Sequence, residues 1–209
     1  TVGFYPEGGH LLVGVQQQVA FKAETSTGEI INVEGYVLNQ RKDTLATLSS
    51  EYAGIGSFTI QTQATDTLCA FVKDKFGHEQ SFTLPKASNT HVALAIHQDT
   101  TFVHYRILTP SDRVLNEDFG LMVHTRGKIL TNRVISREKL SDSIPLDLFP
   151  EGITHFTLFN LDTTVVSERL VFVRKPSTVF QLAVSGSPAN SRQLIKMGLR
   201  VLNERQMSV

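Results

Sequence analysis

The chain of 209 residues contains no tryptophan, a single cysteine and no excess of charge of either sign. Its 20 Lys and Arg residues balance its 20 Asp and Glu residues. We therefore expect no nucleic acid among its partners, because nucleic-acid-binding proteins need a basic surface. The sequence also lacks a run of about 18 apolar residues, so we expect no transmembrane segment in this fragment.

The single cysteine, Cys69, excludes an internal disulfide. It lies in the apolar stretch LCAFV (68–72), without the basic neighbours that would activate a thiolate. This context predicts a small buried hydrophobic residue rather than a nucleophile. Because the first residue is Thr1 rather than Met, we interpret the chain as a processed or excised part of a longer protein.

The residues that are present favour short β-strands. In the segment 31–37, for example, Val33 and Val37 share one face with Ile31, whereas Glu34 and Tyr36 fall on the other. Turn-forming residues recur at intervals of about 8–12 residues, which is typical of an all-β sandwich. A short helical turn is expected only at 137–140. We expect strands at residues 19–23, 31–37, 58–61, 68–72, 80–84, 91–96, 102–108, 119–124, 128–135, 144–148, 154–161 and 168–173.

The strands fall into two blocks of similar length. The stretch LPKASNT (84–90) has no apolar periodicity and predicts a linker, and Pro176 ends the second block. We therefore expect one sandwich at 1–88 and another at 89–176. Each block has the length of a seven-stranded immunoglobulin-like sandwich, although the Cys…Trp…Cys core of antibody domains is absent. The predicted fold class is all-β, with tandem sandwiches.

Residues 177–209 contain two further predicted strands, at 179–184 and 195–202. Two strands are too few to bury a core by themselves. One interpretation is that they open a third β domain, most of which lies outside this sequence. The alternative is a C-terminal hairpin that packs on the second sandwich.

Five phrases in order are similar to a known family of repeats. They are FYPEGG (4–9), QVAFKA (18–23), YAGIGSF (52–58), EGITHFTLFN (151–160) and SERLVFV (167–173). Together they resemble the macroglobulin-like β-sandwich repeats of large Bacteroidetes cell-envelope proteins, some of which carry TonB-dependent receptor plug regions. The resemblance covers most of residues 1–176.

This resemblance implies macroglobulin-like sandwiches in the periplasm or on the outer-membrane surface. It implies as partners the other domains of the same parent protein or other envelope proteins. Where the wider α2-macroglobulin group has chemistry, it uses a thioester formed by a Cys-Gly-Glu-Gln motif. Here Cys69 is followed by Ala70, Phe71 and Val72, so thioester chemistry is not carried over.

The stretch GFYPEGGH (3–10) could be a ligand-cradling loop or a turn between two strands. A phosphate cradle needs a helix after the glycines, and Gly14 interrupts the segment that follows. Pro6 favours a tight turn and glycine permits a positive φ. We therefore predict a turn.

Candidate reactive residues are sparse, and we expect no catalytic residues, no cofactor and no enzyme activity. The weak candidates for a metal site are His97, Asp99 and His104, which a hairpin would bring together. A polar hairpin edge is the simpler interpretation. The expected function is structural and protein-interacting, spacing or docking other domains. The alternative is a carbohydrate-recognition module of a glycan-uptake system, with a glycan as partner.

Overall fold

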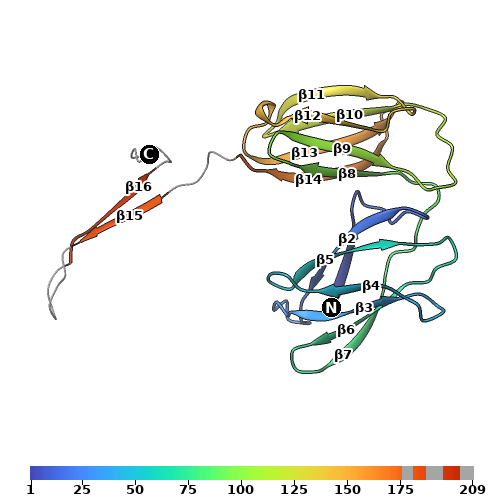
Figure 1. Ribbon diagram of the computed structural model, residues 1–209, viewed down its shortest axis with the longest axis horizontal. Helices are drawn as coiled ribbons and strands as arrows, with labels where there is room; N and C mark the ends of the chain where they lie inside the picture. The colour runs from blue at the N-terminus through green and yellow to red at the C-terminus, as the bar shows by residue number, and fades with distance from the viewer. Residues whose placement is uncertain (176–180, 187–194, 203–209) are drawn as a thin grey trace.

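The computed structural model describes residues 1–175, 181–186 and 195–202, and the regular secondary structure in these residues is almost entirely β-strand (Figure 1). The first seven strands form two antiparallel sheets, with the orders β1-β2-β5 and β4-β3-β6-β7. Their bounds are β1 Val2–Pro6, β2 Gln16–Ala23, β3 Val33–Leu38, β4 Thr44–Ser49, β5 Ile55–Gln61, β6 Cys69–Asp74 and β7 Glu79–Thr83. The predicted all-β fold class is confirmed.

The next seven strands repeat the same plan. Their sheets have the orders β12-β9-β8 and β11-β10-β13-β14, so that three strands again face four. Their bounds are β8 Ala93–Gln98, β9 Phe102–Leu108, β10 Phe119–Thr125, β11 Lys128–Ile135, β12 Ser141–Pro145, β13 Gly152–Asn160 and β14 Val165–Val173. This is the arrangement of tandem immunoglobulin-like sandwiches.

Each sandwich has its own hydrophobic core. In the first, β2 alternates between exposed and buried side chains, and Val19, Phe21 and Ala23 are fully buried. In the second, Phe119, Phe149 and Phe156 are fully buried, and the rings of the last two stack 6.0 Å apart. Period-two alternation places one face of each strand in the core, which explains why the sequence pattern predicted these strands.

Two predictions about local structure are wrong. Residues 137–140 form a plain turn, because Ser136 accepts hydrogen bonds from Glu138 N at its Oγ (3.2 Å) and from Lys139 N at its carbonyl (3.0 Å). The strand expected at 144–148 ends at Pro145 and is followed by a short 3₁₀ helix, η1 (Leu146–Leu148). Pro145 precedes the first residue of η1 and has φ −54° and an extended ψ of 134°, so the helical turn starts only at Leu146.

The prediction that Cys69 is buried is also wrong, since its side chain is only partly buried. Strand alternation explains the difference. Leu68, Ala70 and Val72 point into the core, which leaves Cys69 and Phe71 on the outer face of β6.

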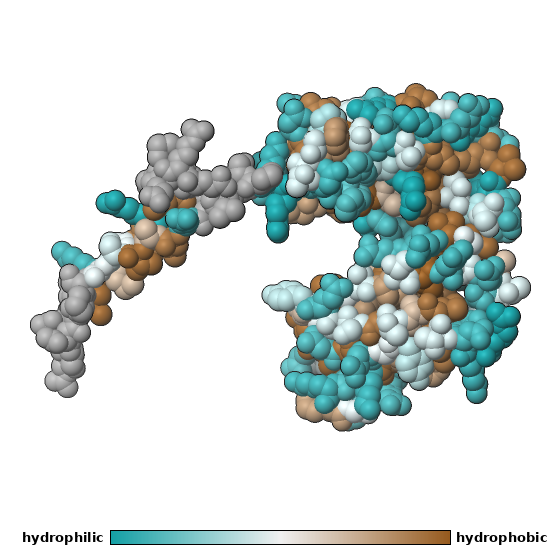
Figure 2. Space-filling view, viewed as in Figure 1, coloured by the Kyte–Doolittle hydropathy of each residue, from teal (hydrophilic) through white to brown (hydrophobic). Residues whose placement is uncertain are grey.

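A separate antiparallel hairpin consists of β15 (Gln181–Gly186) and β16 (Met197–Leu202). The first two residues of the strand predicted at 179–184 lie outside the described residues, and β15 contains the rest of that strand. The strand predicted at 195–202 contains β16. One face of the hairpin carries a set of large apolar side chains that are 44–65% exposed (Figure 2). These are Leu182, Val184, Met197, Leu199 and Val201. No helix in the described part of the chain is long and apolar enough to span a membrane.

Candidate functional site: the junction of the two sandwiches

The predicted turn in GFYPEGGH is confirmed, and it lies at the junction of the two sandwiches. Gly9 N donates to the Pro6 carbonyl (3.0 Å), which closes a tight turn after β1. Gly8 and Gly9 have φ values of +77° and +95°, which glycine adopts without steric strain.

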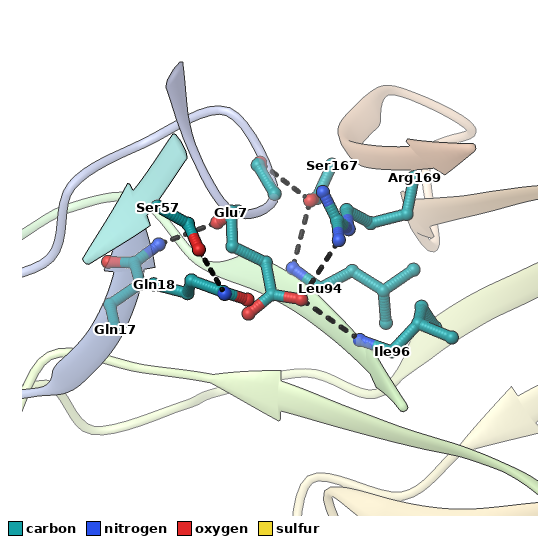
Figure 3. A network of polar contacts seen from close by, with 9 residues as sticks. Glu7, Gln17, Gln18, Ser57, Leu94, Ile96, Ser167 and Arg169 are labelled. Atoms are coloured by element: carbon teal, nitrogen blue, oxygen red, sulfur yellow. Dashed lines mark hydrogen bonds and ion pairs between the residues drawn. The ribbon is translucent and has the colours of Figure 1, made fainter. Parts of the chain in front are cut away.

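A buried glutamine holds the loop in shape from inside the first sandwich. The side chain of Gln17 is 2% exposed and lies on the inner face of β2. Its Nε2 donates to the Glu7 carbonyl at 2.6 Å (Figure 3). The same Nε2 donates to the His10 carbonyl (2.7 Å), and its Oε1 accepts from Leu12 N (3.0 Å). Buried polar groups of this kind stabilise one loop conformation, because breaking any of the bonds leaves a buried group unpaired.

The glycine turn contacts the second sandwich through Ser167 of β14. Ser167 Oγ donates to the Gly8 carbonyl (2.8 Å) and accepts from Leu94 N (2.9 Å), so one buried hydroxyl joins both sandwiches (Figure 3). A Cβ atom at Gly8 would lie 2.5 Å from Leu94 N and 2.8 Å from Ala93 Cβ. Only glycine permits this close approach.

An ion pair lies beside this contact. Arg169 Nη2 donates to Glu7 Oε1 (3.1 Å), and Ile96 N donates to the same oxygen at 3.4 Å. The Glu7 side chain is 14% exposed and that of Arg169 is 31% exposed. Because the pair is partly shielded from water, it is screened less than a fully exposed pair.

Apolar contacts complete the junction. Leu12 of the first sandwich forms a small buried cluster with Ala93 and Leu108 of the second. The predicted linker is anchored to the same loop, because Ser88 N donates to Leu11 O (2.7 Å) and Val13 N donates to Ser88 O (3.0 Å). The two sandwiches are therefore docked, not joined by a loose tether.

A pair of histidines also crosses the junction. The rings of His10 and His91 stack with centroids 3.9 Å apart, and His91 Nδ1 lies 2.7 Å from Ser88 Oγ. Burial, and to a smaller extent the neighbouring His91, hold the pKa of His10 below its ordinary value. Both causes favour the neutral ring in the docked arrangement.

The weak metal-site candidates do come together in part. His97 and His104 are opposite each other on β8 and β9, with ring centroids 6.3 Å apart, and His104 Nε2 lies 2.7 Å from Asp99 Oδ2. Among the described residues, however, no three His, Cys, Asp or Glu side chains form a group that could hold a metal ion. The two histidines instead line a hollow of about 560 Å³, to which Glu7 and Gln18 also contribute.

A second site lies on the outer face of the sheet β4-β3-β6-β7. A groove of about 640 Å³ there contains the stacked rings of Tyr36 and Phe71, whose centroids are 5.7 Å apart. Its remaining lining includes both charged and hydroxyl side chains. These are Glu34, Thr47, Ser49, Glu51, Ser57, Lys73 and Glu79.

Sequence reasoning did not identify the junction residues, although some signals were present. Gln17 interrupts an otherwise apolar face of β2, which marks it as a polar group in the core. Alternation along β14 places Glu168 and Arg169 on opposite faces, which favours an ion pair with a neighbouring strand. The structure instead pairs Arg169 with Glu7 of the other sandwich, which no local pattern specifies.

No protein-family model matches the chain, and no curated protein does. A solved structure titled "Biofilm associated protein - BSP domain" is similar over 85% of this chain, with 13% identity and a TM-score of 0.39. The match covers 30% of that other chain, so the present chain spans less than a third of its length. The fold class therefore rests on the sheets of the structure itself, which are those of tandem β-sandwiches of the immunoglobulin-like kind.

Proposed function

We propose that this chain is a non-enzymatic structural and protein-interaction region of a multidomain cell-envelope protein, where it spaces or docks other domains. The observation that supports this role is the junction, in which Ser167 and Arg169 bind the loop that carries Glu7 and Gly8. A spacer needs a set angle between its units, and contacts that satisfy buried polar groups on both sides favour one angle.

The proposed location is the periplasm or the outer-membrane surface. The resemblance of residues 1–176 to macroglobulin-like repeats supports it, as do the two copies of the same strand plan. The partners would be other domains of the same parent protein or other envelope proteins.

The hairpin β15–β16 supports a longer string of sandwiches. Each sandwich opens with an antiparallel hairpin, first β1–β2 and then β8–β9. The pairing of Leu182 with Val201 and of Val184 with Leu199 gives β15–β16 an apolar face like the inner faces of those hairpins. We propose that it opens a third sandwich, whose other sheet would cover this face.

The spacing role is tested by comparing Gly8→Ala with Gly9→Ala in the full chain. Both variants place alanine at a positive φ, which destabilises by roughly 1–2 kcal/mol. Only Gly8→Ala also adds a Cβ that meets Leu94 and Ala93, whereas a Cβ at Gly9 has nothing within 4 Å. Small-angle X-ray scattering should therefore show a larger radius of gyration and a broader distance distribution for Gly8→Ala alone.

Circular dichroism provides the control, since both variants should keep the strand spectrum of the parent chain. If the scattering curve of Gly8→Ala superimposes on those of the parent and of Gly9→Ala, the glycine turn does not set the arrangement. The spacing role would then lose its main support.

The second candidate function is carbohydrate recognition in a glycan-uptake system. The observation that favours it is the groove on the first sandwich, where exposed aromatic rings lie among charged and hydroxyl side chains. This candidate is compatible with a spacing role, because Tyr36 and Phe71 of the groove are not among the residues that join the two sandwiches.

A further inference from the structure

The groove on the first sandwich is built from two neighbouring rows of side chains that run across the strands. The strand register places Thr47, Tyr36 and Phe71 opposite one another in one row. The second row lies two residues away from the first on each of the strands β4, β3 and β6. It consists of Ser49, Glu34, Lys73 and Glu79, which the register also places opposite one another. Since alternate residues share a face, both rows project from the outer face of the sheet.

The first row offers an exposed aromatic platform. The rings of Tyr36 and Phe71 stack with an interplanar angle of 21°, and the two residues are 45% and 39% exposed. Aromatic side chains contribute most to stability when they are buried, so an exposed stacked pair marks a surface where another molecule can bind. The ring faces can accept the C–H groups of a sugar ring.

The second row selects against an anionic ligand and carries both hydrogen-bond donors and acceptors. Lys73 lies between Glu34 and Glu79, and its ammonium is 3.8 Å from the Glu79 carboxylate. Three carboxylates in the lining, those of Glu34, Glu51 and Glu79, would repel an anionic ligand. A cationic ligand would have to compete with Lys73, which already pairs with Glu79. Sugar hydroxyls both donate and accept hydrogen bonds, so they can use the alternating acceptors and donors of this row.

We propose that the outer face of the sheet β4-β3-β6-β7 binds an uncharged oligosaccharide, with a sugar ring on Tyr36 and Phe71. The sugar hydroxyls bond to Glu34 and Lys73. The volume of about 640 Å³ lies within the range of about 300–1,000 Å³ that is usual for small-molecule sites. This inference rests on the second candidate function and specifies its site and its class of ligand.

The test is calorimetric titration of the full chain with uncharged hexasaccharides of β-1,4-linked glucose, xylose and mannose and of α-1,4-linked glucose. The charged probes are hexamers of galacturonic acid and of glucosamine. We expect saturable binding of at least one uncharged hexamer. Tyr36→Ala and Phe71→Ala should each weaken it about tenfold, because each removes half of the platform.

Phe76→Ala is the matched control, since Phe76 is an aromatic residue of the same sandwich that is 70% exposed and lies outside the groove. It should bind as the parent chain does. Tyr36→Phe keeps the ring and should retain most of the affinity. Both variants also show whether a loss of binding follows from the platform or from general damage to the sandwich.

Three results would overturn the proposal. They are no binding of any uncharged hexamer, binding of charged hexamers alone, and unchanged affinity in both alanine variants. The last result would leave carbohydrate recognition in place as a function and move its site elsewhere. None of these results affects the spacing role, which is read from scattering and not from ligand binding.

Discussion

At the scale of single residues, Arg169 forms its ion pair with a residue that is distant in the sequence and not with a neighbour on an adjacent strand. Its neighbour Glu168 lies on the other side of β14, 3.3 Å from Thr157 Oγ1 of the adjacent strand. Arg169 instead reaches Glu7 of the other sandwich, 162 positions earlier in the sequence. Its Nη2 makes the contact with Glu7, whereas its Nε is buried and has no hydrogen-bond partner in the structure.

A double-mutant cycle with Glu7→Gln and Arg169→Met should give a coupling energy of about 1 kcal/mol in urea unfolding. Gln keeps a hydrogen-bond acceptor for Ile96 N, and Met keeps much of the packing of the arginine stem, so the cycle isolates the charge contact. We expect the coupling to fall as salt is added, although less than for a fully exposed pair. A coupling of zero would mean that the ion pair does not help to dock the sandwiches.

At the scale of elements, the hairpin β8–β9 is closed by a carboxylate. Asp99 Oδ1 accepts from Thr101 N (2.6 Å) and Phe102 N (2.7 Å), while Oδ2 lies 2.7 Å from His104 Nε2. The bond to His104, followed by those to the two backbone amides, lowers the pKa of Asp99 to about 2. Asp99 and His104, two of the three residues weighed as a metal site, thus stabilise a turn.

This lowered pKa predicts a dependence of stability on pH. A depressed folded-state pKa contributes stability above the unfolded-state value, near 4, and the contribution is lost as the pH falls toward 2. Asp99→Asn removes the charge but keeps an acceptor for the turn. Urea unfolding should therefore show that the parent chain is more stable than Asp99→Asn at pH 7. The difference should shrink between pH 4 and pH 2, whereas a difference independent of pH would contradict the assigned role.

At the scale of the whole molecule, the chain repeats one arrangement of strands. Three strands face four in each sandwich, and the hairpin β15–β16 repeats the element with which each sandwich begins. A two-stranded hairpin is marginally stable in water unless another surface covers its apolar face. The exposure of Leu182, Val184 and Leu199 shows that neither sandwich covers this face in the described structure.

The proposal of a third unit predicts rapid hydrogen exchange in the hairpin of this chain. Amides of residues 181–186 and 197–202 should exchange with free energies of opening near zero, whereas those of β2 and β10 approach the global value. Mass spectrometry measures the exchange of the hairpin amides and compares it with that of peptides from β9, which serve as the protected reference. Protection of the hairpin equal to that of β9 would favour the alternative, in which it packs on the second sandwich.

Most of the strands were predictable from the sequence because their alternation is strong, and β9 and β11 have the predicted bounds. The strand β4 was not predicted, since Leu48 is its only fully buried residue and small polar residues surround it. Glu34 and Tyr36 were correctly placed on an outer face. Their position beside Lys73 and Phe71 depends on the register between β3 and β6, which alternation alone does not specify.

The sequence by itself determined the all-β class and the tight turn in GFYPEGGH, because both follow from local backbone preferences and from the period of apolar residues. Only the tertiary structure decided that this turn docks against Ser167 and Arg169, and that Tyr36 stacks on Phe71. The physical reason is that these contacts join residues far apart in the chain. Their partners are set by strand register and by the packing of one sandwich on the other, which no local pattern records.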